Sequence, residues 1–251
     1  CIRDRQYSKS DMTAGGSWTK IGNNILGEGE SDYFGRSVSI SNDGSVLASG
    51  AYRNDSNGTK SGHVRVYLYN NSDWIQIGQD IIGEDAGDDA GWSVSLSGDG
   101  SVVVIGSLDS TNVNGDNNAG QVRVWKYSNP GVTGGSWTQL GDDIEGEAYN
   151  DWTGYAVSIN SDGSIIALSD RFNDDNGENA GRVRVFQYSN SDMTAGGSWI
   201  KIGNILGEGA GDYLTSASGL SLSSDGTVLA CGSQNNNSCL LYTSPSPRDM
   251  S

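Results

Sequence analysis

The chain contains one motif four times, and this repetition constrains its fold more than any other feature. The first copy, FGRSVSISNDGSVLASGA (34–51), places alternating apolar and polar residues on both sides of an Asp-Gly pair. Asp-Gly between two alternating runs is a strong signal for a β-hairpin. Recurrence at a period of 56–63 residues indicates structural units that stack or are arranged radially. The later copies occupy residues 90–107, 153–170 and 217–233, and the four aspartates are Asp43, Asp99, Asp162 and Asp225.

Each unit contains four strand signals separated by turn residues. A run that begins with Trp18, Trp74, Trp137 or Trp199 is followed by an acidic loop, the two runs around Asp-Gly, a polar loop and a strongly alternating run such as GHVRVYLY (62–69). No segment has helical periodicity, and a β-helix would need a much shorter repeat. The sequence therefore predicts an all-β chain that folds as a β-propeller of four-stranded antiparallel blades, because radial repetition protects the strand edges.

The residues around the first hairpin resemble a known repeat family. Phe34-Gly35 and Gly50-Ala51 on either side of Asp-Gly resemble the FG-GAP repeat, which builds the propellers of integrin α-subunits and of many microbial surface proteins. The runs 54–67 and 173–186 resemble the variant common in the microbial proteins. The resemblance covers residues 8 to about 236, although only the first unit has Phe-Gly itself.

The resemblance implies that a blade begins at Phe-Gly and ends with the Trp-led run. The two half-blades at the ends could close a four-bladed ring, but we favour an arc of a larger propeller. Residues 239–249 resemble a translated sequencing adapter, so we expect 239–251 to be a non-native or disordered tail. The predicted array (1–238) then consists of the outer strands of one blade (1–26), three blades (34–82, 90–144 and 153–205) and the inner hairpin of a further blade (216–236).

Composition excludes several classes of function. Lys and Arg total 15 against 31 Asp and Glu, which gives a net charge of −16, whereas a nucleic-acid-binding protein needs the opposite sign. No stretch approaches the roughly 18 apolar residues of a membrane-spanning helix, so we expect no membrane insertion. The three cysteines lack the spacing of a metal site. Because the chain starts at Cys1, we expect its true start to be missing and the natural protein to continue beyond Ser238.

The hairpins are poor calcium sites. The resemblance implies a DxDxDG calcium loop at this place, but each hairpin here offers a single carboxylate. Calcium takes six to eight oxygen ligands, several of them anionic. We therefore predict no cofactor, with calcium not supported by the hairpins, and little dependence of stability on calcium.

Two other recurring loops, GExxxDxxG and NDSNG, are expected on one face of the propeller, which in integrins binds the ligand. Their acids could form a rim for a cationic, calcium-bridged or polyhydroxyl partner. Alternatively they cap turns or pair between blades with Arg65, Arg123 and Arg184, and recurrence in every unit favours this second interpretation. The ligand-face candidates are Glu28, Asp32, Asn54, Asp55, Glu84, Asp88, Glu147, Asp151, Glu208 and Asp212.

Evidence for catalysis or metal binding is thin. Asp174, Asp175 and Glu178 are close in sequence and form a weak metal candidate, although a solvated turn is the simpler interpretation. His63 is the sole histidine and has no recognisable catalytic partner. Paired carboxylates such as Asp88-Asp89 could serve a glycosidase, but nothing in the sequence separates their environments. We therefore predict that the chain is not an enzyme.

The sequence thus predicts an extracellular or cell-surface module for adhesion or ligand binding, with a protein or carbohydrate partner. Asn54, Asn57 and Asn70 are candidate N-glycosylation sites, and Asn236 is a fourth. One alternative is an intracellular WD-repeat-like scaffold, but its period of roughly 40–45 residues and its Gly-His and Trp-Asp pairs are missing. A carbohydrate-active propeller enzyme is the other alternative.

Overall fold

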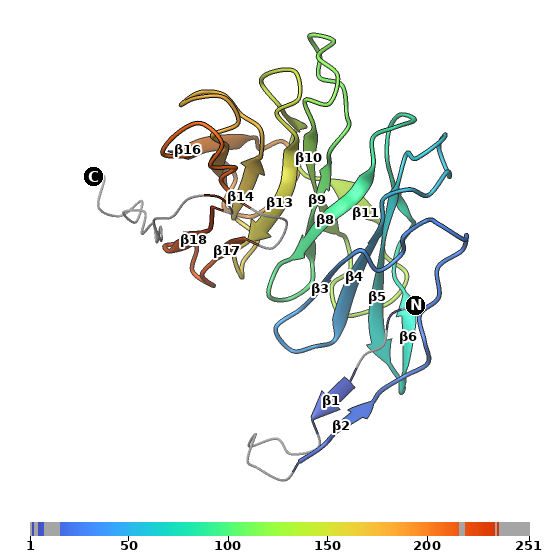
Figure 1. Cartoon of the computed structure of the whole chain (residues 1–251). Coiled ribbons are helices and arrows are strands. Elements are labelled where there is room, and N and C mark those ends of the chain that lie inside the picture. Colours follow the sequence, from blue (N-terminus) through green and yellow to red (C-terminus); the bar gives the residue numbers. More distant parts are fainter. Residues whose placement is uncertain (1, 3–4, 8–15, 216–218, 234, 236–251) are drawn as a thin grey trace.

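The computed structural model describes residues 2, 5–7, 16–215, 219–233 and 235. Within these ranges all helices and strands assigned are β-strands, joined by turns and loops. Three antiparallel sheets follow one another along the chain as the blades of a β-propeller, with a two-stranded sheet at each end (Figure 1). The fold class is therefore the predicted one. The described residues contain no helix that could cross a membrane.

The strands of each blade are consecutive in sequence and neighbours in the sheet. The first blade comprises β3 (Ser37–Ile40), β4 (Val46–Ala51), β5 (His63–Asn70), β6 (Asp73–Gln76) and β7 (Ile81–Ile82). The second comprises β8 (Ala90–Leu96), β9 (Val102–Ser107), β10 (Gln121–Tyr127), β11 (Trp137–Gln139) and β12 (Ile144–Glu145). The third comprises β13 (Thr153–Ile159), β14 (Ile165–Asp170), β15 (Arg182–Tyr188) and β16 (Trp199–Leu206).

The outer edge differs between the blades. In the first two blades two short strands, β6 with β7 and β11 with β12, pair with the third strand. In the third blade the single strand β16 does so, with a register shift at Val185/Phe186. The run WIKIGNI is one residue shorter than its counterparts WIQIGQDI and WTQLGDDI, which accounts for the continuous strand.

Apolar side chains between successive blades form the core. Val64 and Val66 of the first blade pack with Leu96, Val103 and Ile105 of the second. A second cluster joins Val122 and Val124 to the third blade in the same way. Each blade thus buries one face against the next, as expected for a repeat whose units cannot bury their apolar face alone.

Glycine explains the family motif in physical terms. A Cβ on Gly50 would lie 2.0 Å from the carbonyl oxygen of Gly91 in the next blade, and one on Gly106 would lie 2.2 Å from that of Gly154. In the first two blades the Gly near the end of the second strand, Gly50 or Gly106, therefore faces the Gly that opens the following blade. Any side chain there would separate the two backbones.

The recurring Trp residues also join successive blades. Trp137 donates its indole N–H to the carbonyl of Ile77, and Trp199 donates to that of Leu140. A Cβ on Gly78 would lie 2.5 Å from the Trp137 ring, so Gly leaves room for the indole. These tryptophans pack against the preceding blade.

The two end sheets are separate from each other. β1 (Arg5–Tyr7) and β2 (Trp18–Lys20) precede the first blade, whose Trp74 packs with Ile25. β17 (Leu220–Leu222) and β18 (Leu229–Cys231) pack against the third blade. The predicted tail (239–251), Cys1, Cys239 and Asn236 lie outside the described residues.

Candidate functional site

The Asp-Gly hairpins are closed turns. Asp43 accepts hydrogen bonds from the backbone N–H of Ser45 and from the hydroxyls of Ser41 and Ser45, at 2.7–2.9 Å. Asp99 and Asp225 do the same within their own hairpins. These bonds lower the pKa of Asp43, chiefly through the Ser45 N–H, and that of Asp225 to about 2 through Ser223 and Thr227. The carboxylates are occupied by the turns that they stabilise.

The two polar loops of the sequence lie together at each junction between blades. The loop between β4 and β5 accepts backbone hydrogen bonds from the loop that leads into the next blade: Gly87 donates to Thr59, and Asp89 to Lys60. The same pairing recurs where Trp152 donates to Asn118. We call the surface formed by these paired loops the loop face.

The recurring glutamates pair with the recurring arginines. Glu28 lies 2.5 Å from Arg65, and Glu84 lies 3.2 Å from Arg123. Glu147 reaches both Arg184, at 3.6 Å, and Arg182, at 2.7 Å. Glu28, Glu84 and Glu147 therefore hold arginine side chains. Glu208, the remaining predicted rim glutamate, is also exposed.

The recurring aspartates of the same motif cap turns. Asp88 accepts hydrogen bonds from the backbone N–H groups of Glu84 and Asp85, at 2.9 and 2.8 Å. The other three each accept one such bond from their own loop: Asp32 from Gly29, Asp151 from Ala148 and Asp212 from Gly209. As a set, the acids of GExxxDxxG organise the loop face.

Two candidates in the NDSNG loop have structural roles. Asn54 is 6% exposed, donates to Asp32 and accepts from the backbone of Ser56, so the fold leaves no room for a glycan on it. Asp55 accepts from the backbone N–H of Lys60. The other two acceptors, Asn57 and Asn70, are exposed, and Asn57 donates to the carbonyls of Gly83 and Glu84.

The weak metal candidate of the third blade does not form a cluster. Asp175 turns to Arg182, at 2.7 Å, and Asp174 accepts from the backbone N–H of Asn179. Asp174 and Glu178 instead face a groove of about 350 Å³ between two loops. Its other lining residues are Tyr149, Asn150, Trp152, Phe172 and Asn179. The groove therefore combines aromatic rings with carboxylate and amide groups.

Aromatic rings form a continuous band across the blades on the loop-face side. Ring centroids of successive members lie 4.6–6.2 Å apart. Arg36 lies 4.6 Å from the Trp92 ring, and Arg171 lies 4.6 Å from the Tyr155 ring. The members of this aromatic band, in order, are Tyr33, Tyr52, Trp92, Tyr155, Trp152, Phe172 and Tyr213.

The structure separates the environments of Asp88 and Asp89. Asp88 caps its turn, whereas Asp89 is 7% exposed and its Oδ1 has no hydrogen-bond partner. Burial, followed by the nearby Asp109 carboxylate, raises the pKa of Asp89 to about 7, and burial also raises the pKa of Asp109. Both side chains are buried, so hydrogen bonding separates their environments, and the sequence does not show which of two adjacent carboxylates the turn will satisfy.

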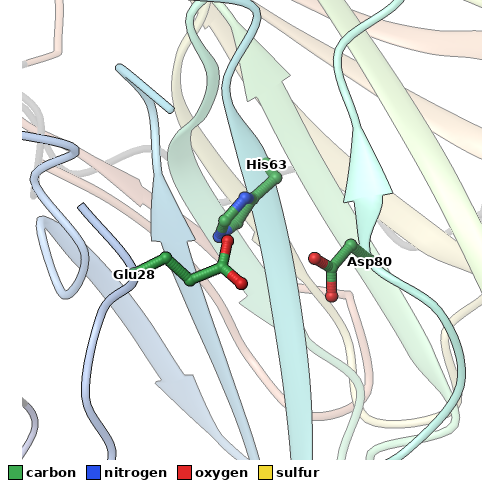
Figure 2. A group of neighbouring side chains, drawn as sticks. All are labelled: Glu28, His63 and Asp80. Atoms are coloured by element: carbon green, nitrogen blue, oxygen red, sulfur yellow. The ribbon is translucent and has the colours of Figure 1, made fainter. Parts of the chain in front are cut away.

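Three titratable side chains lie close together at the first blade. Glu28, His63 and Asp80 point toward one another, and their possible ligand atoms all lie within 4.8 Å (Figure 2). Among the described residues this is the one group of three or more His, Cys, Asp or Glu side chains so close together. Sequence reasoning missed it because Asp80 lies in the outer strand run, outside the recurring loops.

The aromatic band and the groove were also missed. Their residues occupy equivalent positions, but the residue type changes between units: Tyr33 is replaced by Asp89, Trp152 and Tyr213, and Trp92 by Arg36 and Tyr155. A search for residues that recur in every unit passes over such positions. The available signal was the aromatic residue next to the Gly that opens a blade.

Comparison with known proteins supports the family of the repeat. Residues 28–69 match the FG-GAP repeat family, and the chain carries an FG-GAP repeat there, as its Phe-Gly and Gly-Ala pairs predicted. No curated protein sequence matches the chain.

Solved structures resemble the chain at low sequence identity. Sqt1 from Chaetomium thermophilum matches with a TM-score of 0.50 and 17% identity over 81% of this chain and 42% of that one. The periplasmic gluconolactonase PpgL of Pseudomonas aeruginosa matches with a TM-score of 0.48 and 15% identity over 84% and 57%. A Bacteroides uniformis protein, provisionally described as a 6-phosphogluconolactonase, gives 0.47 and 14% over 82% and 52%. The chain spans about half the length of these structures.

The prediction that the chain is not an enzyme, made because no catalytic group could be recognised in the sequence, is contradicted by these neighbours. Two of them are described as lactonases. At such identities the neighbours show the fold alone and assign no activity to this chain.

Proposed function

From a chain that carries an FG-GAP repeat within a β-propeller, we propose a ligand-binding module that acts outside the cell and takes a carbohydrate on its loop face. The observation that carries this proposal is the groove between residues 149–152 and 172–179. Ligand pockets typically combine aromatic walls with a few polar groups that fix orientation.

The chemistry of the groove suits a polyhydroxyl ligand. The rings of Trp152 and Phe172 lie 4.6 Å apart at 71°, so the walls of the groove are fixed relative to each other. Aromatic surface packs against the C–H face of a sugar ring, while carboxylate and amide groups such as Asp174 and Asn179 can accept from or donate to its hydroxyls. Tyr149, which is 63% exposed, is free to cover a bound ring.

Two features support a place outside the cell. FG-GAP repeats are typical of extracellular proteins, and the net charge of −16 suits a highly soluble surface module. Asn70 is exposed in an Asn-Asn-Ser acceptor, so it can carry a glycan without loss of a buried contact. A glycan on Asn70 of the natural protein, measured by peptide mapping, would support secretion, and a fully unmodified Asn57 and Asn70 would count against it.

The binding proposal is tested with a glycan array followed by calorimetry on the best ligand. We expect Tyr149→Ala to weaken that ligand at least tenfold without a change in melting temperature, because this ring is mostly exposed. Val132→Ala, on an exposed loop that connects β10 and β11, is the matched control and should bind as the wild type does. Equal affinity of Tyr149→Ala and wild type would exclude the groove, and no glycan bound by the wild type would exclude the carbohydrate class. The same glycans are inspected for cleavage, which would add catalysis to binding.

A further inference from the structure

One position in the blades holds a different side chain each time. His63, Gln121 and Arg182 open the third strand of the three blades and pair directly with Ala51, Ser107 and Asp170. The positions are therefore equivalent in the sheet. In each blade the recurring arginine follows two residues later in the same strand.

Two of these three side chains bind a neighbouring carboxylate. Gln121 donates its amide to Asp143, and Arg182 binds Glu147 at 2.7 Å. His63 is 1% exposed, yet neither of its ring nitrogens has a hydrogen-bond partner. A buried polar group without a partner costs free energy, so its persistence calls for an explanation.

The imidazole is suited to act as a ligand. Burial, together with the positive charge of Arg65, lowers the pKa of His63 and so favours the neutral ring. A neutral imidazole offers a lone pair to a metal ion, and two carboxylates face it (Figure 2). Glu28 comes from the loop before the first blade, and Asp80 from the turn between β6 and β7.

Arg65 leaves lone pairs of both carboxylates available for a metal ion. It lies 2.5 Å from Glu28 and binds Asp80 through two hydrogen bonds, at 2.9 and 2.7 Å. A carboxylate has about four lone-pair positions, so it can accept from a guanidinium and still coordinate a metal. Carboxylate ligands held by a further hydrogen-bond donor are the usual arrangement around protein metal ions.

The third blade shows that a second positive charge fits at this place. There Arg182 stands where the first blade has His63, and Arg184 stands where it has Arg65. Glu147, the counterpart of Glu28, lies within 2.7 Å of Arg182 and 3.6 Å of Arg184. The fold therefore accommodates two positive charges around this glutamate, which in the third blade are both arginine side chains.

We propose that Glu28, His63 and Asp80 bind a divalent transition-metal ion of the zinc type, which supplies to the first blade the second cation that Arg182 supplies to the third. An imidazole with two carboxylates is a donor set that Zn²⁺ accepts. Ca²⁺ and Mg²⁺ take oxygen ligands and would leave the buried imidazole unused. The ion would join the loop before the first blade to its third and outer strands.

The sole histidine of the chain makes the test specific. Zinc chloride is titrated into ¹⁵N-labelled protein while the imidazole resonances are recorded, so that binding to cysteine or to surface acids does not register. We expect these resonances to move at one equivalent of Zn²⁺ and not to move with Ca²⁺. Unchanged resonances at a tenfold excess of Zn²⁺ would overturn the proposal.

Variants distinguish the three-residue site from binding by histidine alone. Glu28→Gln with Asp80→Asn should weaken the Zn²⁺ affinity measured on the imidazole at least tenfold. Glu84→Gln, at the equivalent position of the second blade, should leave it unchanged. Equal affinity of the double variant and the wild type would show that the carboxylates are not ligands. His63→Gln, which places the second blade's residue in the first, should fold and should lose the rise in melting temperature that Zn²⁺ gives the wild type; if it keeps that rise, the proposal fails.

Discussion

The first and third blades place opposite chemistry on the same backbone frame. Where the third blade has Asp170 opposite Arg182, the first has Ala51 opposite His63. The loop that follows differs in the same sense, because Asp175 binds Arg182 and its counterpart is Ser56. One blade therefore buries a network of charges where the other buries neutral side chains.

This difference indicates that charged residues which contact one another are exchanged together between repeat units. A buried arginine needs several acceptors, and Arg182 has Glu147, Asp170 and Asp175 within 2.7 Å. Without Arg182 the fully buried Asp170 would keep Arg184 as its one cationic partner, and removal of one partner from a buried ion-pair network is costly. The strand pairing of the first and third blades stays the same while such sets are exchanged.

The largest effect is expected when the charged set of the third blade is broken. Asp170 is fully buried and accepts from Arg182, Arg184 and Thr153 at 2.6–2.8 Å. Asp170→Ala leaves two buried guanidinium groups short of a partner, so we expect a loss of about 3–5 kcal/mol in the free energy of unfolding. Urea denaturation measures it.

The control exchanges the whole set. The triple variant Asp170→Ala, Asp175→Ser and Arg182→His gives the third blade the residues of the first, and it should be more stable than Asp170→Ala alone. Replacing a buried ion pair by neutral groups is often tolerated where removal of one partner is not. A triple variant as unstable as the single one would show that the residues do not act as a set.

The sequence predicted the frame of these blades and not their charge sets. Hairpin and strand patterns recur in every unit, so the propeller, its family and the pairing of acids with Arg65, Arg123 and Arg184 could be derived from repetition. His63 has no recognisable partner in the sequence, and the aromatic band is missed because its residue types vary between units. Such features depend on which side chains meet across a junction between blades, which periodicity does not encode.

The second prediction concerns the junction between the first and second blades and the junction between the second and third. We expect the first of them to make stability depend on pH through Asp89. Asp89 of the first junction stands where the second has Trp152. Its pKa rises from 3.8 to about 7 on folding, so between these values the folded state binds more protons and stability falls as pH rises. Relative to Asp89→Asn, we expect the wild type to lose on the order of 3 kcal/mol between pH 4 and pH 8. Urea denaturation across this range gives the comparison.

Asparagine suits this position because Asp89 has a φ of 54°, a conformation that Asn tolerates. The control is Asp109→Asn, which removes the second cause of the raised pKa. The pH dependence of that variant should be weaker and its midpoint lower than in the wild type. Parallel profiles for wild type and Asp89→Asn would show that Asp89 ionises as freely as in the unfolded chain.

The smallest of these effects tests how closely the first two blades approach. Gly50 in the first blade stands where the third has Ser169, which bonds to the backbone N–H of Ala156. In Gly50→Ser the new Cβ would lie 2.0 Å from the Gly91 carbonyl, so the two strands must separate. We expect a loss of about 1–3 kcal/mol, typical of overpacking. Gly209→Ala, where a Cβ meets nothing within 4 Å, should cost far less. If both substitutions prove equally mild, the junction between the first two blades is looser than that contact implies.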